Sequence, residues 1–414
     1  MHVWIVNHFA LTPDQPGGTR HIELSKELQK HNIEVTIVGA GRHHISDRNH
    51  VPRGEPWYRD DVQGVRFHWI KTPSSSSNYL RRIWNNIFFS ASVIGRRGLK
   101  DLPRPEIIVG TSPDLISALS AYLASRFFKV PFVLEIRDIW PLSIIQIGLF
   151  SQKHPFIVVL GLIERFLYAR ADWIVTLLPD AARHIVPFGG APERITWVPN
   201  GVTIGDQAPA DQYVPDVSGD FTLMYAGSHG AANNLSCLLD AAALLKKRGQ
   251  HHSLKLRMIG EGPNKTALIR DAKKRGLDFV SFEPAVPKSQ IGGFLREADA
   301  FCLVFHARPI YGYGMSANKL FDYMAVGRPI IIAFDAGYNP VTAAEAGIGV
   351  PSENAEALAD AIYDMMQKTA EERLRMGLNA QAYARDNHSM AQLGSRLAEV
   401  LFKVAEKGQK KRIE

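Results

Sequence analysis

Apolar runs that alternate with glycine-containing turns and amphipathic stretches predict strands followed by helices. Near the start of the chain, a strand is expected at residues 2–6, a helix at 21–31 and a second strand at 33–38. The same order returns later, with a strand expected at 221–225 and a helix at 234–247. Units of this kind are typical of doubly wound folds. The pattern therefore predicts an α/β protein with two Rossmann-like domains and parallel sheets.

The stretch at residues 203–220 is polar, contains glycine and proline, and has the composition of a linker. We therefore expect a first domain at residues 1–200, a linker at 201–220 and a second domain at 221–389. Residues 390–414 are expected to form a final helix that ends in a basic tail.

The second domain contains the stretch with the clearest candidate chemistry. Two apolar runs, 301–305 and 330–333, are expected to be buried strands, and a loop between them leads into a helix from Ser316 to Val326. Ser316 suits the N-cap position, so the free backbone N–H groups of the first turn would face a ligand. A phosphate ester is the anion most often bound at such a place.

Two charged residues strengthen this hypothesis. Lys319 and Asp322 share a face of the expected helix, so a cation would meet phosphates while a carboxylate accepts hydrogen bonds from sugar hydroxyls. A nucleotide would use both groups. A capped helix with an ordinary surface ion pair fits the same stretch equally well.

Composition narrows the class of protein. A chain of 414 residues, 46% hydrophobic and 21% charged, is typical of a globular protein of two or three domains. We expect no signal peptide, and the longest apolar run, 156–163, is far shorter than the roughly 18 residues that span a bilayer. Cys237 and Cys302 are expected to be buried thiols of a cytoplasmic protein, and no His, Cys and Asp residues have the spacing of a metal site.

The net charge of +7 indicates an anionic partner. The expected helix at residues 78–100 has apolar positions at three- and four-residue spacing, so it could lie on an anionic membrane with Trp84, Phe88 and Phe89 among the headgroups. Packing of the same stripe on the first domain's sheet is an equal alternative. We expect no nucleic-acid partner, because the sequence has no zinc-finger spacing, RNA-binding signature or helix-turn-helix pattern. The cations of residues 78–104 are Arg81, Arg82, Arg96, Arg97, Lys100 and Arg104.

Three segments resemble one known family. They are EIRDIWP at residues 135–141, ITWVPNGV at 195–202 and GMSANKLFDYMAVGRPII at 314–331. Each is similar to a segment of the family 4 retaining glycosyltransferases, which have the GT-B fold of two facing Rossmann-like domains. The similarity is greatest to the bacterial branch that builds O-antigen and capsule repeat units and includes N-acetyl-L-fucosamine transferases. In this fold the final helix crosses back to the first domain, which the resemblance implies for residues 390–414.

The family's signature contains two glutamates separated by seven residues. Asp322 stands at the second position, which relatives use on the ribose, and Gly314 stands at the first, so the carboxylate near the donor sugar is absent. Relatives also carry cations for the donor phosphates in the loop where residues 228–233 stand here, and none of these six residues is a lysine or an arginine. The resemblance therefore shifts the cationic role to other residues.

The candidate catalytic residues are Lys319 and two residues that follow the expected strand at 132–136. Arg137 would stabilise the leaving diphosphate, and Asp138 would orient or deprotonate the acceptor hydroxyl. The alternative is structural, with Asp138 capping the following turn and pairing with Arg137. The substrate-binding residues that the resemblance implies are Gly17, Gly18, Arg20, Gly227, Ser228, Ser316, Asn318, Leu320, Asp322 and Glu345.

The activity that the resemblance implies is transfer of a hexosyl group, with N-acetylated amino sugars among the candidates. The expected donor is a nucleotide sugar, UDP-linked with GDP left open, and the expected acceptor is a lipid-linked saccharide at the inner face of the cell membrane. No metal or other cofactor is expected. Two other classes stay open: a sugar-nucleotide epimerase of the same fold, and a catalytically inactive donor-binding partner subunit.

Overall fold

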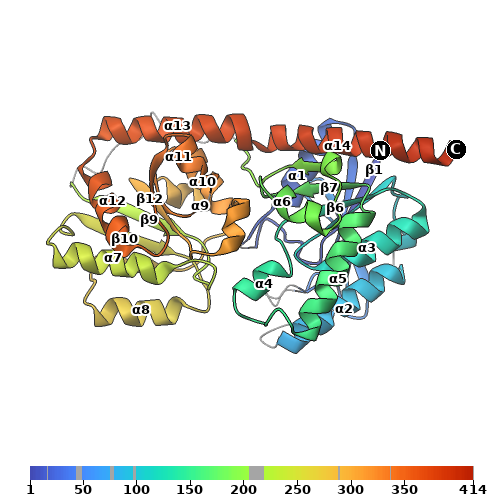
Figure 1. The fold of residues 1–414 in the computed structure, drawn as a ribbon, viewed down its shortest axis with the longest axis horizontal. Helices are drawn as coiled ribbons and strands as arrows, with labels where there is room; N and C mark the ends of the chain where they lie inside the picture. The colour runs from blue at the N-terminus through green and yellow to red at the C-terminus, as the bar shows by residue number, and fades with distance from the viewer. Residues whose placement is uncertain are drawn as a thin grey trace. The chain divides into compact units, whose positions relative to one another are not determined.

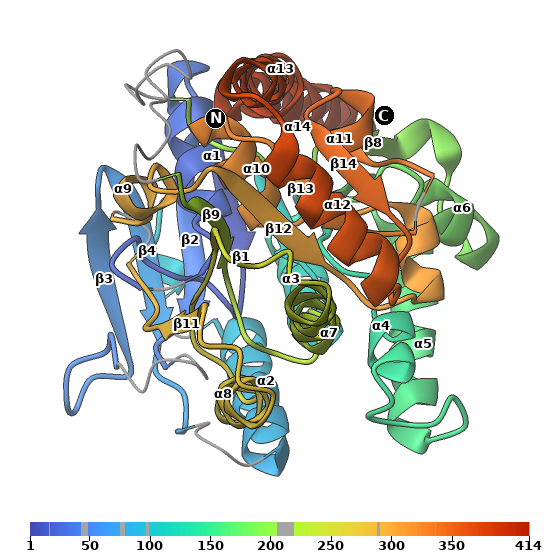
Figure 2. The ribbon, with the colours of Figure 1, turned by 90° about the vertical axis from the view of Figure 1, so that its left-hand side faces the viewer.

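The structure, a computed structural model, divides into two compact units (Figure 1). Figure 2 shows the same ribbon turned by 90°. Unit 1 consists of Met1–Pro199 with Met390–Glu414, and unit 2 consists of Asn200–Ser389. Most of the linker predicted at 201–220 lies outside the described residues. The structure describes residues 1–15, 17–42, 49–74, 79–96, 99–204, 219–287, 290–335 and 337–413.

The sheet of unit 1 has the strand order β3-β4-β2-β1-β5-β6-β7-β8. Neighbouring strands are parallel except β3 and β4, which form an antiparallel hairpin. The order changes direction between β1 and β5, so the carboxyl ends of these strands flank a topological switch point, where α/β proteins bind ligands. The strands are β1 (His2–Val6), β2 (Glu34–Ala40), β3 (Trp57–Val62), β4 (Val65–Ile70), β5 (Ile107–Thr111), β6 (Phe132–Ile136), β7 (Trp173–Thr176) and β8 (Ile195–Trp197).

Alternation along β1 sends its side chains to two helical layers. Val3 and Ile5 join a core cluster that contains residues of α1 and α14, whereas Trp4 contacts Phe128 of α3 with ring centroids 5.0 Å apart. The final helix α14 therefore completes the core of unit 1. The helices are α1 (Arg20–Lys30), α2 (Tyr79–Ile94), α3 (Leu115–Phe128), α4 (Leu142–Gln146), α5 (Pro155–Arg170), α6 (Ala182–Ile185) and α14 (Met390–Ile413), with short 3-10 turns at Leu99–Asp101, Val186–Phe188 and Pro192–Arg194.

The basic helix α2 packs against α3. Phe89 and Val93 are fully buried, whereas Trp84 is 60% exposed. The prediction that Phe89 lies among lipid headgroups is therefore wrong. Apolar positions at three- and four-residue spacing extend around more than one side of this helix, and the side with Phe89 faces the protein.

The sheet of unit 2 has the order β11-β10-β9-β12-β13-β14 and is parallel throughout. Its strands are β9 (Phe221–Ala226), β10 (Leu254–Ile259), β11 (Val280–Glu283), β12 (Ala300–Val304), β13 (Ile330–Ala333) and β14 (Gly347–Val350). Its helices are α7 (Leu235–Lys247), α8 (Lys265–Lys274), α9 (Ile291–Leu295), α10 (Asn318–Val326), α11 (Pro340–Ala343), α12 (Ala355–Gln367) and α13 (Ala370–His388), with a 3-10 turn at Pro309–Tyr313.

Cys237 and Cys302 are free thiols buried in the core of unit 2, as predicted. In the part of the chain that the structure describes, no helix combines the length and the apolar character that crossing a membrane requires.

Candidate active site

The loop after β9 and the first turn of α10 meet at the carboxyl edge of the unit 2 sheet. Lys319 Nζ donates hydrogen bonds to Tyr225 Oη at 2.9 Å and to Asn233 Oδ1 at 2.6 Å. Tyr225 Oη and Asn233 Nδ2 in turn donate to the carbonyl oxygen of Ser228, at 2.7 and 2.9 Å. Lys319 Nζ also lies 4.7 Å from the centroid of the Tyr225 ring. These contacts place a lysine beside a loop whose residues 228–233 include no cation of their own.

The backbone of this loop comes close to the lysine at Gly227. A Cβ atom at Gly227 would lie 3.1 Å from Lys319 Cδ and 3.1 Å from Tyr225 Oη, tighter than most real contacts. A larger residue would therefore displace the lysine or the tyrosine. The structure brings together three of the predicted site residues, Gly227, Ser228 and Lys319.

Burial lowers the pKa of Lys319 to about 7. The oxygens that its Nζ contacts belong to a phenol and an amide, which are neutral. Among the residues that the structure describes, no carboxylate pairs with Nζ to offset the loss of hydration. A bound diphosphate would supply the missing negative charge and restore the protonated form. The arrangement therefore favours an anionic ligand.

Other residues of α10 fix the helix to the end of β9. Tyr323 Oη accepts a hydrogen bond from the backbone N–H of Ala226 at 2.7 Å and donates to its carbonyl oxygen at 2.8 Å. Asn318 and Asp322 are half-buried in the first two turns of α10. The side chain of Leu320 is fully buried in the core of unit 2, so the substrate contact predicted for Leu320 would have to come from its backbone.

Ser316 is not the N-cap that the sequence predicts. The helix begins at Asn318, Ala317 holds the N-cap position, and no side chain caps the helix. Ser316 Oγ instead accepts a hydrogen bond from the backbone N–H of Asn200 at 2.7 Å, and its carbonyl oxygen accepts one from Asn200 Nδ2 at 2.6 Å. Asn200 is 116 residues from Ser316 in the sequence, so a local sequence pattern could not predict this hydrogen bond. The first turn of α10 keeps backbone donors that no side chain caps.

Glu345 lies at the other edge of the sheet from Lys319. Because all strands of this sheet are parallel, the loops after β9 and β12 leave from its carboxyl edge, whereas Glu345 comes directly before β14, at the amino edge. Its side chain is exposed and its backbone has φ of 51°. A donor bound beside Lys319 would therefore not contact Glu345, and the contact expected from the sequence stays a prediction.

In unit 1, Arg137 and Asp138 follow β6 at the carboxyl edge of the sheet. Ser112, at the end of β5, holds this turn, because its Oγ accepts from the backbone N–H of Arg137 at 2.8 Å and donates to the carbonyl oxygen of Asp138 at 3.1 Å. Ser143 donates to Asp138 Oδ2 at 2.9 Å. Burial raises the pKa of Asp138, which is partly offset by that hydrogen bond. A carboxylate with a raised pKa suits the binding or deprotonation of a hydroxyl.

Arg137 forms no ion pair with Asp138 among the described residues, so the structural alternative to a catalytic role does not hold for that pair. Its guanidinium makes no hydrogen bond to any residue that the structure describes. Arg137 therefore keeps its five donors for a ligand.

Arg20 has a different environment. Its Nε donates to Glu135 Oε1 at 2.9 Å, and its two terminal nitrogens donate to the carbonyl oxygens of Val198 and Pro199. The residue is 2% exposed. The side chain is buried and each of its three nitrogens already donates inside the fold, which contradicts the prediction that Arg20 contacts a phosphate.

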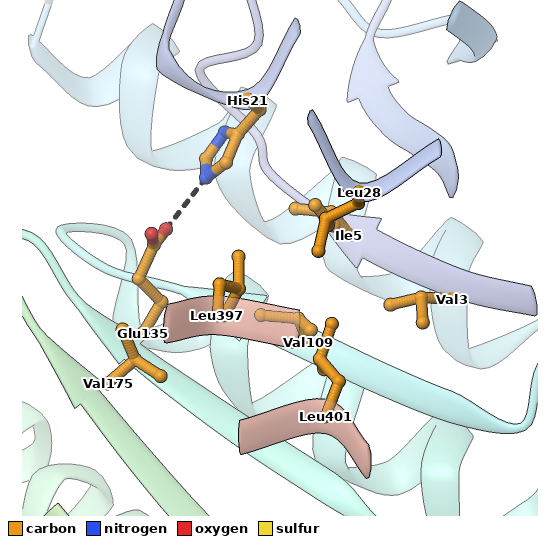
Figure 3. A pocket seen from close by; sticks show the side chains of 9 residues that line it. All are labelled: Val3, Ile5, His21, Leu28, Val109, Glu135, Val175, Leu397 and Leu401. Atoms are coloured by element: carbon orange, nitrogen blue, oxygen red, sulfur yellow. Dashed lines mark hydrogen bonds and ion pairs between the residues drawn. The ribbon is translucent and has the colours of Figure 1, made fainter. Parts of the chain in front are cut away.

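Glu135 also joins His21, whose Nε2 lies 2.7 Å from Glu135 Oε2 (Figure 3). Burial lowers the pKa of His21, and Asn7 Nδ2 lies 2.9 Å from His21 Nδ1, which suits a neutral ring that accepts at Nδ1 and donates at Nε2. Burial alone would raise the pKa of Glu135, but His21 and Arg20 hold it well below its ordinary value. The apolar cavity beside this pair measures about 10 Å³, room for about one water molecule and too small for a substrate.

Sequence reasoning missed a buried group at the switch point. His8 Nε2 lies 2.6 Å from Asn85 Oδ1, and His8 Nδ1 lies 3.8 Å from Asp114 Oδ2. Asp114 caps α3 by accepting from the backbone N–H groups of Ile116 and Ser117. His8 and Asp114 lie within three residues of the ends of β1 and β5, and these neighbouring carboxyl ends could have suggested the pair.

Gly17 and Gly18 lie in the loop before α1, and their contact with the donor stays a prediction. Gly17 has φ of 141°, and a Cβ there would lie 2.5 Å from Leu11 Cδ1, so the loop needs glycine at this position. Among the described residues, no group of three or more His, Cys, Asp and Glu side chains could hold a metal ion.

Both units match families of glycosyltransferases. Residues 17–201 match the family described as glycosyl transferase 4-like domain, and residues 220–368 match the family described as glycosyl transferases group 1. No curated protein sequence matches the chain.

Solved structures resemble the whole chain at low sequence identity. Sucrose-phosphate synthase from Thermosynechococcus elongatus has a TM-score of 0.75 at 14% identity, over 97% of this chain and 98% of that one. HepE from Anabaena, in complex with UDP and glucose, has a TM-score of 0.65 at 16% identity, over 97% and 100%. WaaG, a glycosyltransferase involved in lipopolysaccharide biosynthesis, has a TM-score of 0.67 at 16% identity, over 96% and 99%.

The two family matches and these structures define the chain as a glycosyltransferase with the GT-B fold. Within that class it is a glycosyltransferase of the GT4 type. The predicted fold class and enzyme class are therefore confirmed.

Proposed function

We propose that this glycosyltransferase moves a hexosyl group from a UDP-linked sugar to a hydroxyl of a lipid-linked saccharide, with retention at the anomeric carbon. The observation that carries the donor side is Lys319, a half-buried cation held beside the Gly227–Ser228 loop by neutral oxygens only. The similarity to HepE, which was crystallised with UDP and glucose, supports the choice of UDP. The metal-free chemistry expected from the sequence belongs to the same proposal.

The proposed reaction is a front-face displacement. The bond between the anomeric carbon and the diphosphate oxygen breaks, the acceptor oxygen forms its bond on the same face, and the departing phosphate takes the acceptor proton. Lys319 and the uncapped first turn of α10 stabilise the negative charge that develops on the diphosphate. Arg137 contributes a second cation, and Asp138 orients the acceptor hydroxyl. Asp322 accepts hydrogen bonds from the ribose.

A lipid-linked acceptor follows from the chemistry of unit 1 and from one neighbour. The outer side of α2 carries exposed Arg81, Arg82 and Trp84, which suits an anionic membrane surface. WaaG, whose described role is in lipopolysaccharide biosynthesis, has a similar fold. We therefore place the reaction at the inner face of a bacterial cell membrane, in the assembly of O-antigen or capsule repeat units. The resemblance of residues 314–331 to N-acetyl-L-fucosamine transferases makes an N-acetylated amino sugar a candidate for transfer.

The experiment that tests this proposal is calorimetric titration with UDP, GDP and ADP, followed by donor-turnover assays with sugars linked to the nucleotide that binds. We expect UDP to bind, and we expect Lys319→Ala and Asp322→Ala each to weaken binding by roughly 1–3 kcal/mol. If no nucleotide binds, or if both variants bind as the wild type does, the donor site is not at α10.

The replacement of the first signature carboxylate by Gly314 favours a second candidate, a donor-binding partner subunit without catalysis. Nucleotide-sugar binding with no turnover, even when detergent-solubilised lipid acceptors are supplied, would select this candidate. Transfer to any lipid-linked saccharide would exclude it.

A further inference from the structure

Helix α5 has two apolar sides, and the fold covers only one of them. Ile157, Leu160 and Leu167 are buried against the rest of unit 1. On the other side, four large apolar side chains face solvent, each between 39% and 62% exposed. They are Val158, Val159, Leu162 and Phe166. A soluble helix of this length ordinarily carries polar residues on its outer side.

The exposed apolar surface continues onto neighbouring elements. Phe166 meets Tyr122 of α3 edge to face, with ring centroids 5.2 Å apart, and α3 and α5 pack side by side (Figure 1). Leu123 and Phe127 of α3 are 40% and 55% exposed, and Ile147 and Leu149, between α4 and α5, are 41% and 59% exposed. We call these side chains the α3–α5 face; they are Leu123, Phe127, Ile147, Leu149, Val158, Val159, Leu162 and Phe166.

A groove of about 320 Å³ opens beside this face, between α4, α5 and the turn after α6. Leu142 and Ile145 of α4, Val158 and Leu162 of α5, and Phe188 contribute apolar walls. Two residues of the α3–α5 face therefore also line the groove, so the apolar surface and the groove are continuous.

The exposed charges of α3, α5 and residues 142–154, which carry the α3–α5 face, have one sign. Exposed cations flank it, whereas Glu164 is the one carboxylate in α3, α5 and residues 142–154. Glu164 is buried, accepts a hydrogen bond from Tyr168 Oη at 3.0 Å and lies 2.8 Å from His184 Nε2. It therefore adds no negative charge to the surface. The exposed cations are Arg126, Lys129, Lys153, Arg165 and Arg170.

We propose that the α3–α5 face docks on an anionic lipid bilayer, with its apolar side chains among the acyl chains and its cations on the headgroups. A second copy of the chain fits less well, because a two-fold contact would bring these cations against each other without any exposed carboxylate. A bilayer offers hydrocarbon and negative charge together. This proposal deepens the membrane association in the proposed function and transfers its centre from residues 78–104 to α5.

The first test measures binding to vesicles of phosphatidylcholine with about one third phosphatidylglycerol. We expect the wild type to bind these vesicles. The affinity of the double variant Val159→Glu with Leu162→Glu should be lower by about tenfold or more, because charge replaces apolar area. The matched control is Ile269→Glu with Leu378→Glu, which changes two apolar residues of unit 2 that are 41% and 45% exposed. This control should bind vesicles as the wild type does. Tryptophan fluorescence during denaturant unfolding shows whether unit 1 of each α5 or α2 variant is folded, because all seven tryptophans lie in residues 1–199. Circular dichroism serves the same purpose for the unit 2 control.

The second test separates the elements. Arg165→Gln with Arg170→Gln should weaken binding by about tenfold at low salt. The binding of this variant should also depend less steeply on phosphatidylglycerol content than the binding of the wild type. Arg81→Gln with Arg82→Gln on α2 should have a smaller effect. If the α2 variant abolishes binding and the two α5 variants do not, α2 is the membrane element and the proposal is wrong.

Two other results would overturn the proposal. One is wild-type binding that is no stronger to anionic vesicles than to pure phosphatidylcholine vesicles. The other is that the wild type does not bind vesicles but sediments as a dimer, and that Val159→Glu with Leu162→Glu dissociates this dimer. A second copy of the chain would then cover the α3–α5 face. Neither result depends on UDP binding, so failure of this proposal and failure of the donor site can be distinguished.

Discussion

Arg20 and Lys319 are both cations held inside a Rossmann-like unit, yet their partners differ. Arg20 donates to the carboxylate of Glu135 and to two backbone carbonyls, and its charge is balanced within the protein. Lys319 contacts a phenol and an amide oxygen, and no carboxylate of the residues that the structure describes pairs with it. The difference teaches that the charge of the partner, more than burial or position in a motif, distinguishes a structural cation from one that awaits a ligand.

The largest effect that would test this comparison is on stability. We expect Arg20→Met to lower the free energy of unfolding of unit 1 by about 3–5 kcal/mol, because the buried carboxylate of Glu135 would lose its paired guanidinium and keep the contact with His21. All seven tryptophans lie in residues 1–199, so tryptophan fluorescence during denaturant unfolding reports on unit 1 alone. UDP binding at unit 2 should not change.

The control for that prediction removes both charges. Arg20→Met with Glu135→Gln should recover a large part of the lost stability, since no buried charge is left alone. If the double variant is as unstable as the sum of the two single variants, the pair does not act as one unit, and the comparison with Lys319 loses its basis.

The next effect is on catalysis. Lys319→Met keeps the length of the side chain but removes the charge, and we expect donor turnover to fall by about 10²–10³. The tryptophan-monitored unfolding of unit 1 should be unchanged, because the variant lies in unit 2. A normal rate in Lys319→Met would mean that Arg137 or another cation carries the diphosphate charge.

Local features of the fold could be predicted from the sequence, whereas the different roles of Arg20 and Lys319 could not. The local sequence correctly predicts β13 at 330–333 and the free, buried thiols, because apolar runs and burial are local properties. It cannot separate Arg20 from Lys319, because the partners that decide their roles are remote. Glu135 is 115 residues from Arg20, and Tyr225 and Asn233 are 94 and 86 residues from Lys319. The same limit explains two wrong predictions. Ser316 does not cap α10 because it is hydrogen-bonded to the remote Asn200, and Phe89 is buried because its side of α2 packs on α3.

A smaller effect concerns protons. With its pKa lowered to about 7, Lys319 is mostly neutral in the free protein at about pH 8, and the phosphates of UDP should raise that pKa on binding. The stabilising interaction is therefore fully present below about pH 7 and is lost as pH rises through the pKa of the complex, by up to about tenfold in affinity per pH unit.

Calorimetry of UDP binding at about pH 8, in two buffers with different ionisation enthalpies, should show uptake of close to one proton. Above the phosphate pKa of about 6 the nucleotide itself contributes little. Lys319→Met and the ligand uridine, which has no phosphate, are the controls, and both should show no uptake. Uptake that persists in Lys319→Met would assign the proton to another group.

The smallest expected effect is that of a substitution at Glu345. Comparing it with a substitution in α10 tests which edge of the unit 2 sheet binds the donor. We expect Glu345→Gln to leave UDP affinity and donor turnover within about twofold of the wild type, because an exposed side chain at the amino edge is remote from the loop after β9. The matched variant Asp322→Asn, in α10, should weaken UDP binding by about tenfold. If Glu345→Gln has the larger effect, the donor does not bind at the carboxyl edge. Lys319 would then be a lysine held by neutral partners for a purely structural reason.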